Sequence, residues 1–376
     1  MKKGRILHIS KYYSPYSGGL EDVCRSLVDG VPEYERRVLC FNDGPDDAID
    51  TVGQTQVTRV GLWKEVARQP ISFHFIKTMR RMFREYQPDI VHLHTPNPLI
   101  SLYIQLFKPR KAKLIVHWHS DIIVHRFLHL LFSPIEKRLL RKADHILATS
   151  PNYIDGSPLL SRHREKCTVI PNMVAEPKLA AQPASGLTVA DVQAKYGPNI
   201  VLFVGRHVGY KGIGYLIEAA QYVESNFRLL ICGTGPETEK LKAQAGQNPN
   251  IIFLGRIPDD ELGTYMRASK VFAFPSITKN EAFGVVLAEA MYCGLVPVTF
   301  TIYGSGVNWV SVGGETGIEV PNRDTKAFAR AIDTLLTDET LRLRYSEAAQ
   351  RRVREKFLFS HVHDSLLQVY DKVMQQ

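Results

Sequence analysis

Short apolar runs alternate with amphipathic stretches along most of the chain, and this pattern predicts strands and helices in turn. In the first half, the apolar runs predict strands at 5–10, 37–41, 89–94, 113–119 and 145–149. Helical spacing of apolar residues is found at 20–31, 71–86, 99–107 and in the stretch that ends at Ala143. Apolar strands that alternate with helices are typical of a parallel sheet covered on both faces. The first half therefore predicts an α/β domain.

A stretch rich in proline and alanine interrupts this alternation at residues 173–198 and predicts a linker, with a short helix at Val189–Tyr196 near its end. Alternation then resumes, with strands predicted at 199–204, 227–231, 251–254, 271–274 and 296–299. A last helix is predicted at 364–374, and the pattern does not assign it to either half. We therefore predict two doubly wound Rossmann-like domains, at 1–172 and 199–356, that face a central cleft.

The composition agrees with a folded protein of this kind. The chain has 376 residues, of which 44% are hydrophobic and 23% are charged, and these values argue against wholesale disorder. No apolar run approaches the roughly 20 residues of a membrane helix, and the first residues show no cleavage pattern of a secretory signal. The five cysteines are scattered without a C-x-x-C pair, which argues against a disulfide scaffold. We expect a cytoplasmic protein.

The net charge of +9 is distributed unevenly. Residues 1–172 contain 26 basic and 17 acidic residues, so the whole excess lies in the first half. A one-sided basic field indicates an anionic partner, which could be nucleic acid, an anionic membrane surface or a phosphorylated substrate. Solvated helix faces explain any single cluster equally well. Nucleic acid is the weakest of these candidates because no helix-turn-helix, zinc-finger or RNA-binding aromatic signature is present.

Ligands of open α/β sheets bind at the carboxyl ends of the strands, so the residues after each strand are the first candidates for chemistry. Gly18 and Gly19 precede the first helix, where backbone amides attract anions, although a plain tight turn explains them as well. The turn from Gly205 to Gly212 carries two cations, Arg206 and Lys211, which suit a diphosphate. Neither turn has the spacing of a dinucleotide fingerprint or of a P-loop. Two more strand-to-helix turns begin near Gly233 and Gly255.

Two strands of the first half end in a His-x-His pair. His92 with His94, and His117 with His119, each share one face of a strand because residues two apart point the same way. Four such histidines could bind zinc if the strands were neighbours, but no carboxylate or cysteine completes the set, and we predict no metal site. Buried structural histidines are the alternative for His92 and His117. His119 differs because Ser120 and Asp121 follow it at a strand exit, where a histidine can touch a substrate.

The segment 275–291 carries the strongest signal. Its two carboxylates, Glu281 and Glu289, are eight positions apart, and Phe283 and Gly284 are predicted to open a helix with free backbone amides. Glu289 lies in an otherwise apolar helix, where an unpaired carboxylate would be costly. A sugar with two adjacent hydroxyls is its natural partner. The alternative is a charged helix surface that follows a capping turn.

This segment resembles the E-x7-E signature of the retaining glycosyltransferases of family 4, which have the GT-B fold. The turns at 205–206, 211–212, 233–235, 169–172 and 18–19 follow in the order of that family, so the resemblance covers nearly the whole chain. It implies that the last helix, about 357–376, crosses back onto the first domain. Two features depart from the family: Met173 stands where many members have glycine, and residues 207–210 replace the usual arginine or aspartate.

The resemblance also implies roles for the candidate residues. A nucleoside-diphosphate sugar would bind the second domain, where Arg206 and Lys211 hold the diphosphate and stabilise the leaving group. Glu289 would bind the ribose, and Glu281 would bind sugar hydroxyls. In the first domain, His119 would touch the donor sugar and Asp121 would stand near the acceptor. The remaining candidates for donor binding come from the glycine turns, the base-bordering turn and the helix start: Gly18, Gly19, Gly205, Gly233, Arg256, Ile257, Ala282, Phe283, Gly284 and Val285.

The function implied by the resemblance is retaining transfer of a hexose from a GDP- or UDP-linked sugar, without a metal or other cofactor. The acceptor would be a glycan or a polyprenyl-diphosphate-linked glycan of surface polysaccharide or O-antigen biosynthesis. An anionic membrane surface is a further expected partner, because Arg126–Phe132 places apolar residues beside cations. A buried helix explains that segment equally well. The alternative functions are a nucleotide-sugar epimerase and a non-catalytic protein that binds nucleotides or glycans.

Overall fold

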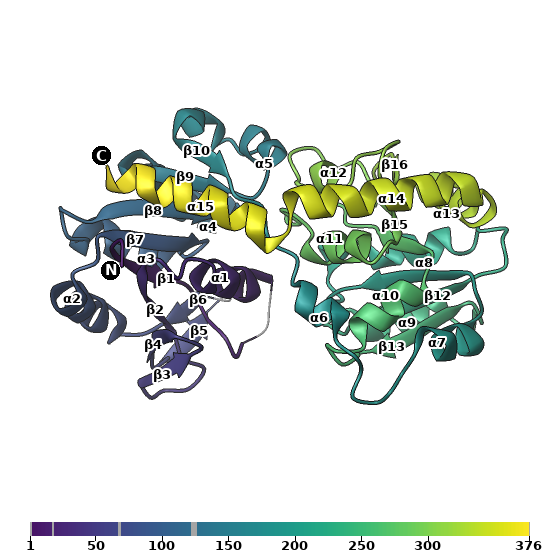
Figure 1. The fold of residues 1–376 in the computed structure, drawn as a ribbon, viewed down its shortest axis with the longest axis horizontal. Coiled ribbons are helices and arrows are strands. Elements are labelled where there is room, and N and C mark those ends of the chain that lie inside the picture. The colour runs from purple at the N-terminus through teal and green to yellow at the C-terminus, as the bar shows by residue number, and fades with distance from the viewer. Residues whose placement is uncertain (1, 17–18, 67–68, 122–125, 376) are drawn as a thin grey trace. The chain divides into compact units, whose positions relative to one another are not determined.

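The computed structural model describes residues 2–375 except 17–18, 67–68 and 122–125. The chain divides into two compact units. Unit 1 comprises Met1–Pro171 together with Val362–Gln376, and unit 2 comprises Asn172–His361. Each unit contains a twisted sheet with helices on its faces (Figure 1).

The sheet of unit 1 has the strand order β10-β9-β8-β7-β1-β2-β4-β3. All neighbouring pairs are parallel except β3 with β4, which is antiparallel at the edge of the sheet. The central strands are almost wholly buried, as the continuous apolar runs of the sequence predict. The strands are β1 (Arg5–Ile9), β2 (Glu35–Phe41), β3 (Ala48–Val52), β4 (Thr55–Val60), β7 (Ile90–Thr95), β8 (Lys113–Trp118), β9 (His145–Ala148) and β10 (Cys167–Val169).

Helices connect these strands in the order expected for parallel pairing. They are α1 (Gly19–Asp29), α2 (Phe75–Tyr86), α3 (Pro98–Phe107), α4 (Arg126–Lys142), α5 (Pro151–Gly156) and the 3₁₀ turn η1 (Ser161–Lys166). A two-stranded hairpin of β5 (Lys64–Val66) and β6 (Gln69–Ile71) precedes α2.

The region between β2 and α2 departs from the sequence-based prediction. Strands β3, β4, β5 and β6 were not predicted, and the helix expected from residue 71 begins only at Phe75. Residues 69–71 pair with the hairpin strand β5 instead. Helical spacing of buried residues is complete only from Phe75 through Met79 to Met82 and Tyr86, and that spacing sets where the helix begins.

The sheet of unit 2 is parallel throughout, with the order β13-β12-β11-β14-β15-β16. All five strands predicted for this half are present, with their ends within one residue of the prediction, and β16 is an additional edge strand. The strands are β11 (Ile200–Val204), β12 (Arg228–Cys232), β13 (Ile251–Gly255), β14 (Val271–Phe274), β15 (Val296–Phe300) and β16 (Ile318–Val320).

The helices of unit 2 cover both faces of its sheet and enclose one continuous apolar core. They are α6 (Glu176–Ala180), α7 (Val189–Tyr196), η2 (Gly209–Lys211), α8 (Ile213–Ala219), α9 (Thr238–Ala245), α10 (Leu262–Ala268), α11 (Val285–Tyr292), α12 (Val307–Val310), α13 (Thr325–Thr337) and α14 (Glu339–Lys356). Residues 173–198, expected as a linker, lie in unit 2 and contain α6 and α7. Helix α7 has the predicted bounds, and Thr188 and Asp191 form a capping box at its start.

The last helix, α15 (Phe359–Met374), contains the predicted helix 364–374 and packs in unit 1 (Figure 1). Asp371 accepts a hydrogen bond from the Tyr34 hydroxyl at 2.7 Å and pairs with Lys3 at 2.7 Å. Tyr370 lies 2.6 Å, hydroxyl to ring nitrogen, from His92 of β7. The C-terminal residues are therefore bound to the sheet that the N-terminal residues begin.

Each sheet has a position at which the strand order reverses, and ligands of doubly wound folds bind beside this position. In unit 1 it lies between β1 and β7, and in unit 2 between β11 and β14. The loops that follow these strands are the places where a site is expected.

Candidate functional site

The loops that leave β11, β12 and β13 of unit 2 lie against one another. The Gly205 amide donates to the Cys232 carbonyl at 3.0 Å, and the Gly233 amide donates to the Gly255 carbonyl at 2.7 Å. Gly233 has φ +117°, and a Cβ atom there would overlap the Gly205 carbonyl. Glycine is therefore required for these loops to approach so closely.

The loop after β11 also contacts the loop after β14, across the position where the strand order reverses. The Ile277 amide donates to the Tyr210 carbonyl at 2.9 Å. Gly212 has φ +66°, and a Cβ atom there would overlap the Pro275 carbonyl. The two loops that carry the predicted diphosphate cations and the predicted sugar carboxylate are thus held together.

Lys211 is buried, although it lies in a turn between a strand and a helix, where a charged side chain is usually exposed. Its ammonium forms an ion pair with the Glu281 carboxylate and lies 5.1 Å from the centre of the Phe274 ring. Burial of the ammonium lowers the pKa of Lys211, but the charges of Glu281 and Tyr210 and the hydrogen bond to Glu281 together outweigh it, so the pKa is raised above its ordinary value. Lys211 is therefore a fixed cation, turned inward because the 3₁₀ turn η2 packs on the next loop.

Arg206 is the exposed cation of the pair. No described residue forms an ion pair with its guanidinium, so it is available to a ligand. One cation is thus preorganised by burial and the other stands in solvent at the same loop.

Glu281 is held from three sides. Its Oε2 accepts from the Ser276 hydroxyl at 3.1 Å and pairs with Lys211, and its backbone carbonyl accepts from the Ser305 hydroxyl. The Gly306 amide binds the carbonyl of the next residue, Ala282, at 2.9 Å. The carboxylate is accordingly buried in a loop that hydrogen bonds and an ion pair hold in place.

Helix α11 begins at Val285, and Gly284, with φ +89°, is its N-cap. The helix therefore starts later than predicted, because Phe283 turns its side chain into the core against Trp309 and Phe357. The backbone amides of Phe283, Gly284 and Val285 donate to no described residue. Free amides at a helix start favour an anion or a hydroxyl oxygen, as the sequence indicated.

Glu289 lies in the middle of α11 and is buried. Arg256 and Ile257 follow β13, with Arg256 exposed and Ile257 half-buried. The predicted donor residues of the second half thus occupy the loops at the carboxyl edge of one sheet and the helix that follows β14.

In unit 1, Gly18 lies outside the described residues, and Gly19 is the first residue of α1. Asp121 is held in place after β8: its Oδ1 accepts from the Trp118 indole at 2.9 Å and from the Ser157 hydroxyl at 2.8 Å, and its amide donates to the Tyr153 hydroxyl at 2.7 Å. Burial and the charge of Asp121 raise the pKa of Glu136, on α4, to about 7. No motif or spacing had indicated this second carboxyl.

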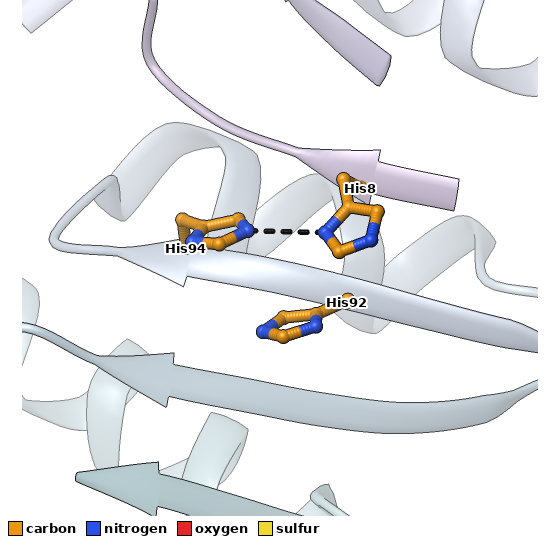
Figure 2. A group of neighbouring side chains, drawn as sticks. All are labelled: His8, His92 and His94. Atoms are coloured by element: carbon orange, nitrogen blue, oxygen red, sulfur yellow. Dashed lines mark hydrogen bonds between the residues drawn. The ribbon is translucent and has the colours of Figure 1, made fainter. Parts of the chain in front are cut away.

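The four histidines of the two His-x-His pairs do meet. Strands β7 and β8 are neighbours, with His94 opposite His117, and β1 adds His8 opposite His92. Five buried imidazoles therefore cover one face of the sheet, and Figure 2 shows three of them. Burial lowers the pKa of all five, to about 3 for His8 and His119. Sequence reasoning missed His8 because it stands alone in its strand.

Two groups of three among these histidines have ring nitrogens within 4.8 Å of one another: His8 with His92 and His94, and His94 with His117 and His119. Their rings are stacked, with 3–30° between the ring planes in the first group and 11–23° in the second. The lone pairs lie in the ring planes, and stacked rings do not direct them toward one point, as tetrahedral zinc at about 2.0–2.1 Å requires. No carboxylate belongs to either group.

Solved structures with the same arrangement of elements are glycosyltransferases of the GT-B fold. Sucrose-phosphate synthase from Thermosynechococcus elongatus matches with a TM-score of 0.81 and 22% identity, over 99% of this chain and 100% of that one. HepE from Anabaena, in complex with UDP and glucose, matches with a TM-score of 0.75 and 18% identity, over 98% of this chain and 100% of that one. The fold of this chain is therefore GT-B, as expected.

Sequence comparison gives the family. The model of "Glycosyltransferase Family 4" matches residues 17–176, and that of "Glycosyl transferases group 1" matches residues 189–352. D-rhamnosyltransferase WbpZ of Pseudomonas aeruginosa is 32% identical over 94% of this chain and 92% of its own length. O-antigen chain mannosyltransferase C of Escherichia coli is 29% identical over 99% of both chains. The chain belongs to the group 1, family 4 glycosyltransferases.

No described helix combines the length and the apolar character needed to cross a bilayer.

Proposed function

We propose that this glycosyltransferase transfers a hexose from a nucleoside-diphosphate sugar to a glycan or lipid-linked acceptor of O-antigen-type polysaccharide, with retention of the anomeric configuration. The observation that carries the proposal is the grouping of Lys211, Glu281 and the free amides before α11 at the point of strand-order reversal. Similarity along nearly the full chain to an O-antigen mannosyltransferase supports the polysaccharide acceptor.

The donor diphosphate would bind between Arg206 and Lys211. Breaking the bond to the sugar leaves negative charge on the diphosphate, and two cations beside it stabilise that charge. Lys211 stays charged at neutral pH because of Glu281, so it needs no proton from solution. Two protein cations can do the work that a divalent metal does in other transferases, and we propose that no metal or other cofactor is needed.

The other donor contacts follow the elements. Glu289 would bind the ribose hydroxyls, and Arg256 and Ile257 would border the base. Glu281 and the amides of Phe283 and Gly284 would bind hydroxyls of the sugar, with Ala282, Val285, Gly205 and Gly233 shaping the loops. In unit 1, His119 would touch the donor sugar, Asp121 would stand near the acceptor, and Gly18 and Gly19 would approach the phosphate or the acceptor.

We favour a GDP-linked sugar with the configuration of mannose over a UDP-linked sugar. The two relatives named above are a mannosyltransferase and a D-rhamnosyltransferase, and rhamnose of the D series is 6-deoxymannose. HepE was solved in complex with UDP, but at 18% identity its similarity supports the fold and not the choice of nucleotide.

The test is a transfer assay in EDTA with GDP-mannose or UDP-glucose and a short alkyl-diphosphate-linked glycan. The proposal predicts release of the nucleoside diphosphate only when the acceptor is present, and a product whose anomeric configuration, read by NMR, equals that of the donor. An epimerase would change the sugar without any acceptor. A non-catalytic protein would bind the nucleotide without turnover. An inverted product would refute the retaining mechanism.

We also propose that unit 1 docks on an anionic membrane surface, which would bring the enzyme to a lipid-linked acceptor at the cytoplasmic face. Helix α2 carries a row of cations, Lys77, Arg80, Arg81 and Arg84, all of them exposed. On either side of the hairpin that precedes α2, the exposed rings of Trp63 and Phe73 pack on each other with centroids 5.1 Å apart. Aromatic rings beside cations are typical of interfacial surfaces. The side chains of residues 126–131, the segment first considered for this role, lie outside the described part of the structure.

Sedimentation with vesicles tests this docking. The protein should sediment with vesicles that contain phosphatidylglycerol at low salt, and binding should weaken at high salt because exposed charges are screened. Replacement of Arg80 and Arg84 by Gln should reduce binding, and replacement of Arg351 and Arg354, which lie on α14 of unit 2, is the matched control. Equal binding to neutral vesicles would contradict the proposal.

A further inference from the structure

Three of the buried histidines form a continuous hydrogen-bonded chain that runs from β1 across β7 to His119, the residue after β8. His8 Nδ1 lies 3.3 Å from His94 Nε2, and His94 Nδ1 lies 3.0 Å from His119 Nε2 (Figure 2 shows the first of these contacts). His8 and His94 are at most 1% exposed, whereas His119 is 7% exposed and is the end of the chain that reaches the surface. That end follows β8, and the proposed function has His119 touch the donor sugar.

Each imidazole in this chain is neutral near pH 7, because burial lowers the pKa of all three rings. A neutral imidazole carries one N–H donor and one acceptor nitrogen. His94 uses both of its ring nitrogens in hydrogen bonds, so it donates to one neighbour and accepts from the other. The protons of the three histidines can therefore be arranged in only two ways, which we call the outward and the inward order. In the outward order, His8 donates to His94, His94 donates to His119 Nε2, and His119 keeps its proton on Nδ1. In the inward order every proton moves to the other nitrogen.

Two features at His8, the inner end of the histidine chain, favour the outward order. His8 Nε2 is buried without a partner among the described residues, so the inward order would leave an unpaired N–H there. An orphaned buried donor is rarer than an under-used acceptor. The second feature is Arg36, a buried cation whose charge acts on His8 and lowers its pKa beyond the effect of burial. A cation near the inner end favours a lone pair there over an N–H.

Arg36 is fixed in this position. Its guanidinium donates to the backbone carbonyls of Val28 at 2.8 Å and Asp29 at 3.3 Å. The direction of the hydrogen bonds along the three histidines is therefore set by groups of unit 1 alone and does not need a ligand.

We propose that His8 and His94 are positioning residues that fix His119 as the Nδ1–H tautomer, so that His119 presents a hydrogen-bond donor to an oxygen of the donor sugar. The role of the sugar rests on the proposed function. The tautomer does not, because it follows from the buried chain. Second partners that fix the tautomer of a functional imidazole are a general device of active sites.

Histidine-selective ¹⁵N NMR of the full chain tests this directly. Each ring nitrogen reports whether it carries a proton, and loss of a signal set in His119→Gln assigns His119. Without any substrate, His119 should show a protonated Nδ1 and an unprotonated Nε2 at pH 7.5. A protonated Nε2 would overturn the proposal.

A matched pair of variants separates positioning from packing. In His8→Asn the amide can keep a donor at the place of Nδ1, and His119 should keep its tautomer. In His8→Leu the donor is lost, and His119 should show a mixture of both tautomers and about a fivefold lower kcat/KM. If neither variant changes the His119 spectrum, His8 does not set the tautomer.

A spectrum recorded with EDTA and then with added Zn²⁺ covers the metal alternative. The proposal predicts identical histidine signals in both. Shifts of the His8, His92 and His94 signals would show that the face is a metal site and would overturn it. If the tautomer is as predicted but no sugar is transferred, the positioning survives and the proposed function fails.

Discussion

The buried ion pair of Lys211 and Glu281 leads to a prediction that separates the two cations of the proposed diphosphate site. Lys211→Met and Arg206→Ala should each lower the transfer rate about a hundredfold or more, because each removes a cation from the leaving group. Only Lys211→Met should also destabilise the fold. Loss of the Lys211 ammonium leaves the Glu281 carboxylate buried beside Ser276 without a cation. Arg206 is exposed, so its replacement leaves no buried charge unpaired.

The size of the stability loss follows from the burial of both partners. Breaking a buried ion pair by removing one partner costs about 3–5 kcal/mol. For a unit of the size of unit 2, about 2–4 °C of Tm per kcal/mol gives a drop of roughly 6–20 °C. Arg206→Ala should shift Tm by about 2 °C or less, because an exposed substitution usually stays within about 0.5 kcal/mol.

Thermal unfolding and initial transfer rates of the two variants, measured side by side, are the assay. The control is the double variant Lys211→Met with Glu281→Gln, in which no charge of the pair remains buried and the new side-chain amide could still accept from Ser276. It should recover most of the lost Tm and none of the lost rate. A Lys211→Met protein as stable as Arg206→Ala would show that the ion pair does not stabilise the loops. A double variant as unstable as the single one would refute the buried-charge argument.

Three further predictions concern other parts of the molecule. The free energy of unfolding should fall as the pH drops below about 6.5, because the histidines bind protons in the unfolded chain but stay neutral when buried in the fold. At pH 5.5, His8 and His119 together should lower it by about 3 kcal/mol, which urea unfolding measures. A free energy of unfolding that stays constant between pH 7 and 5 would contradict the low pKa values of these two histidines. Glu289→Gln should raise the Kd for GDP or UDP, measured by calorimetry, at least tenfold. It should leave the Kd for inorganic pyrophosphate unchanged, since pyrophosphate has no ribose. An equal loss of affinity for both kinds of ligand would show that Glu289 does not bind the ribose. Gly212→Ala should lower Tm more than Gly246→Ala. The two positions share a positive φ near +60°, but only at Gly212 would the new methyl group meet another loop, at the Pro275 carbonyl. An equal drop in Tm for the two variants would mean that the loops of Gly212 and Pro275 can move apart without loss of stability.

Much of the fold could be predicted because its strands are apolar on both faces. Runs such as 200–204 and 271–274 are too continuous for anything but buried strands, and the structure has them within a residue. The prediction failed between β2 and α2, where β3 and the hairpin of β5 and β6 are short, partly exposed and mixed in character. Such strands are set by pairing with their neighbours, and pairing leaves little trace in local periodicity.

The site was predictable as a set of positions but not as a set of contacts. Strand exits and glycine turns point to loops that the structure brings into contact, yet nothing in the spacing of Lys211 and Glu281 tells that they pair across the reversal of strand order. The same is true of the histidine face. Two His-x-His pairs are visible in the sequence, but their meeting depends on the pairing of β7 with β8, and His8 joins them only because β1 is the next strand.

The most direct test of the central claim, a metal-independent donor site for a nucleoside-diphosphate sugar, is a thermal-shift measurement with GDP, UDP, their sugars and NAD in the presence of EDTA. A ligand at about 100 times its Kd adds roughly 2.7 kcal/mol, which corresponds to about 5 °C or more for a unit of this size. We predict such a shift with GDP or UDP and none with NAD. No shift with any nucleotide, or a shift that appears only when a divalent metal replaces EDTA, would contradict the account.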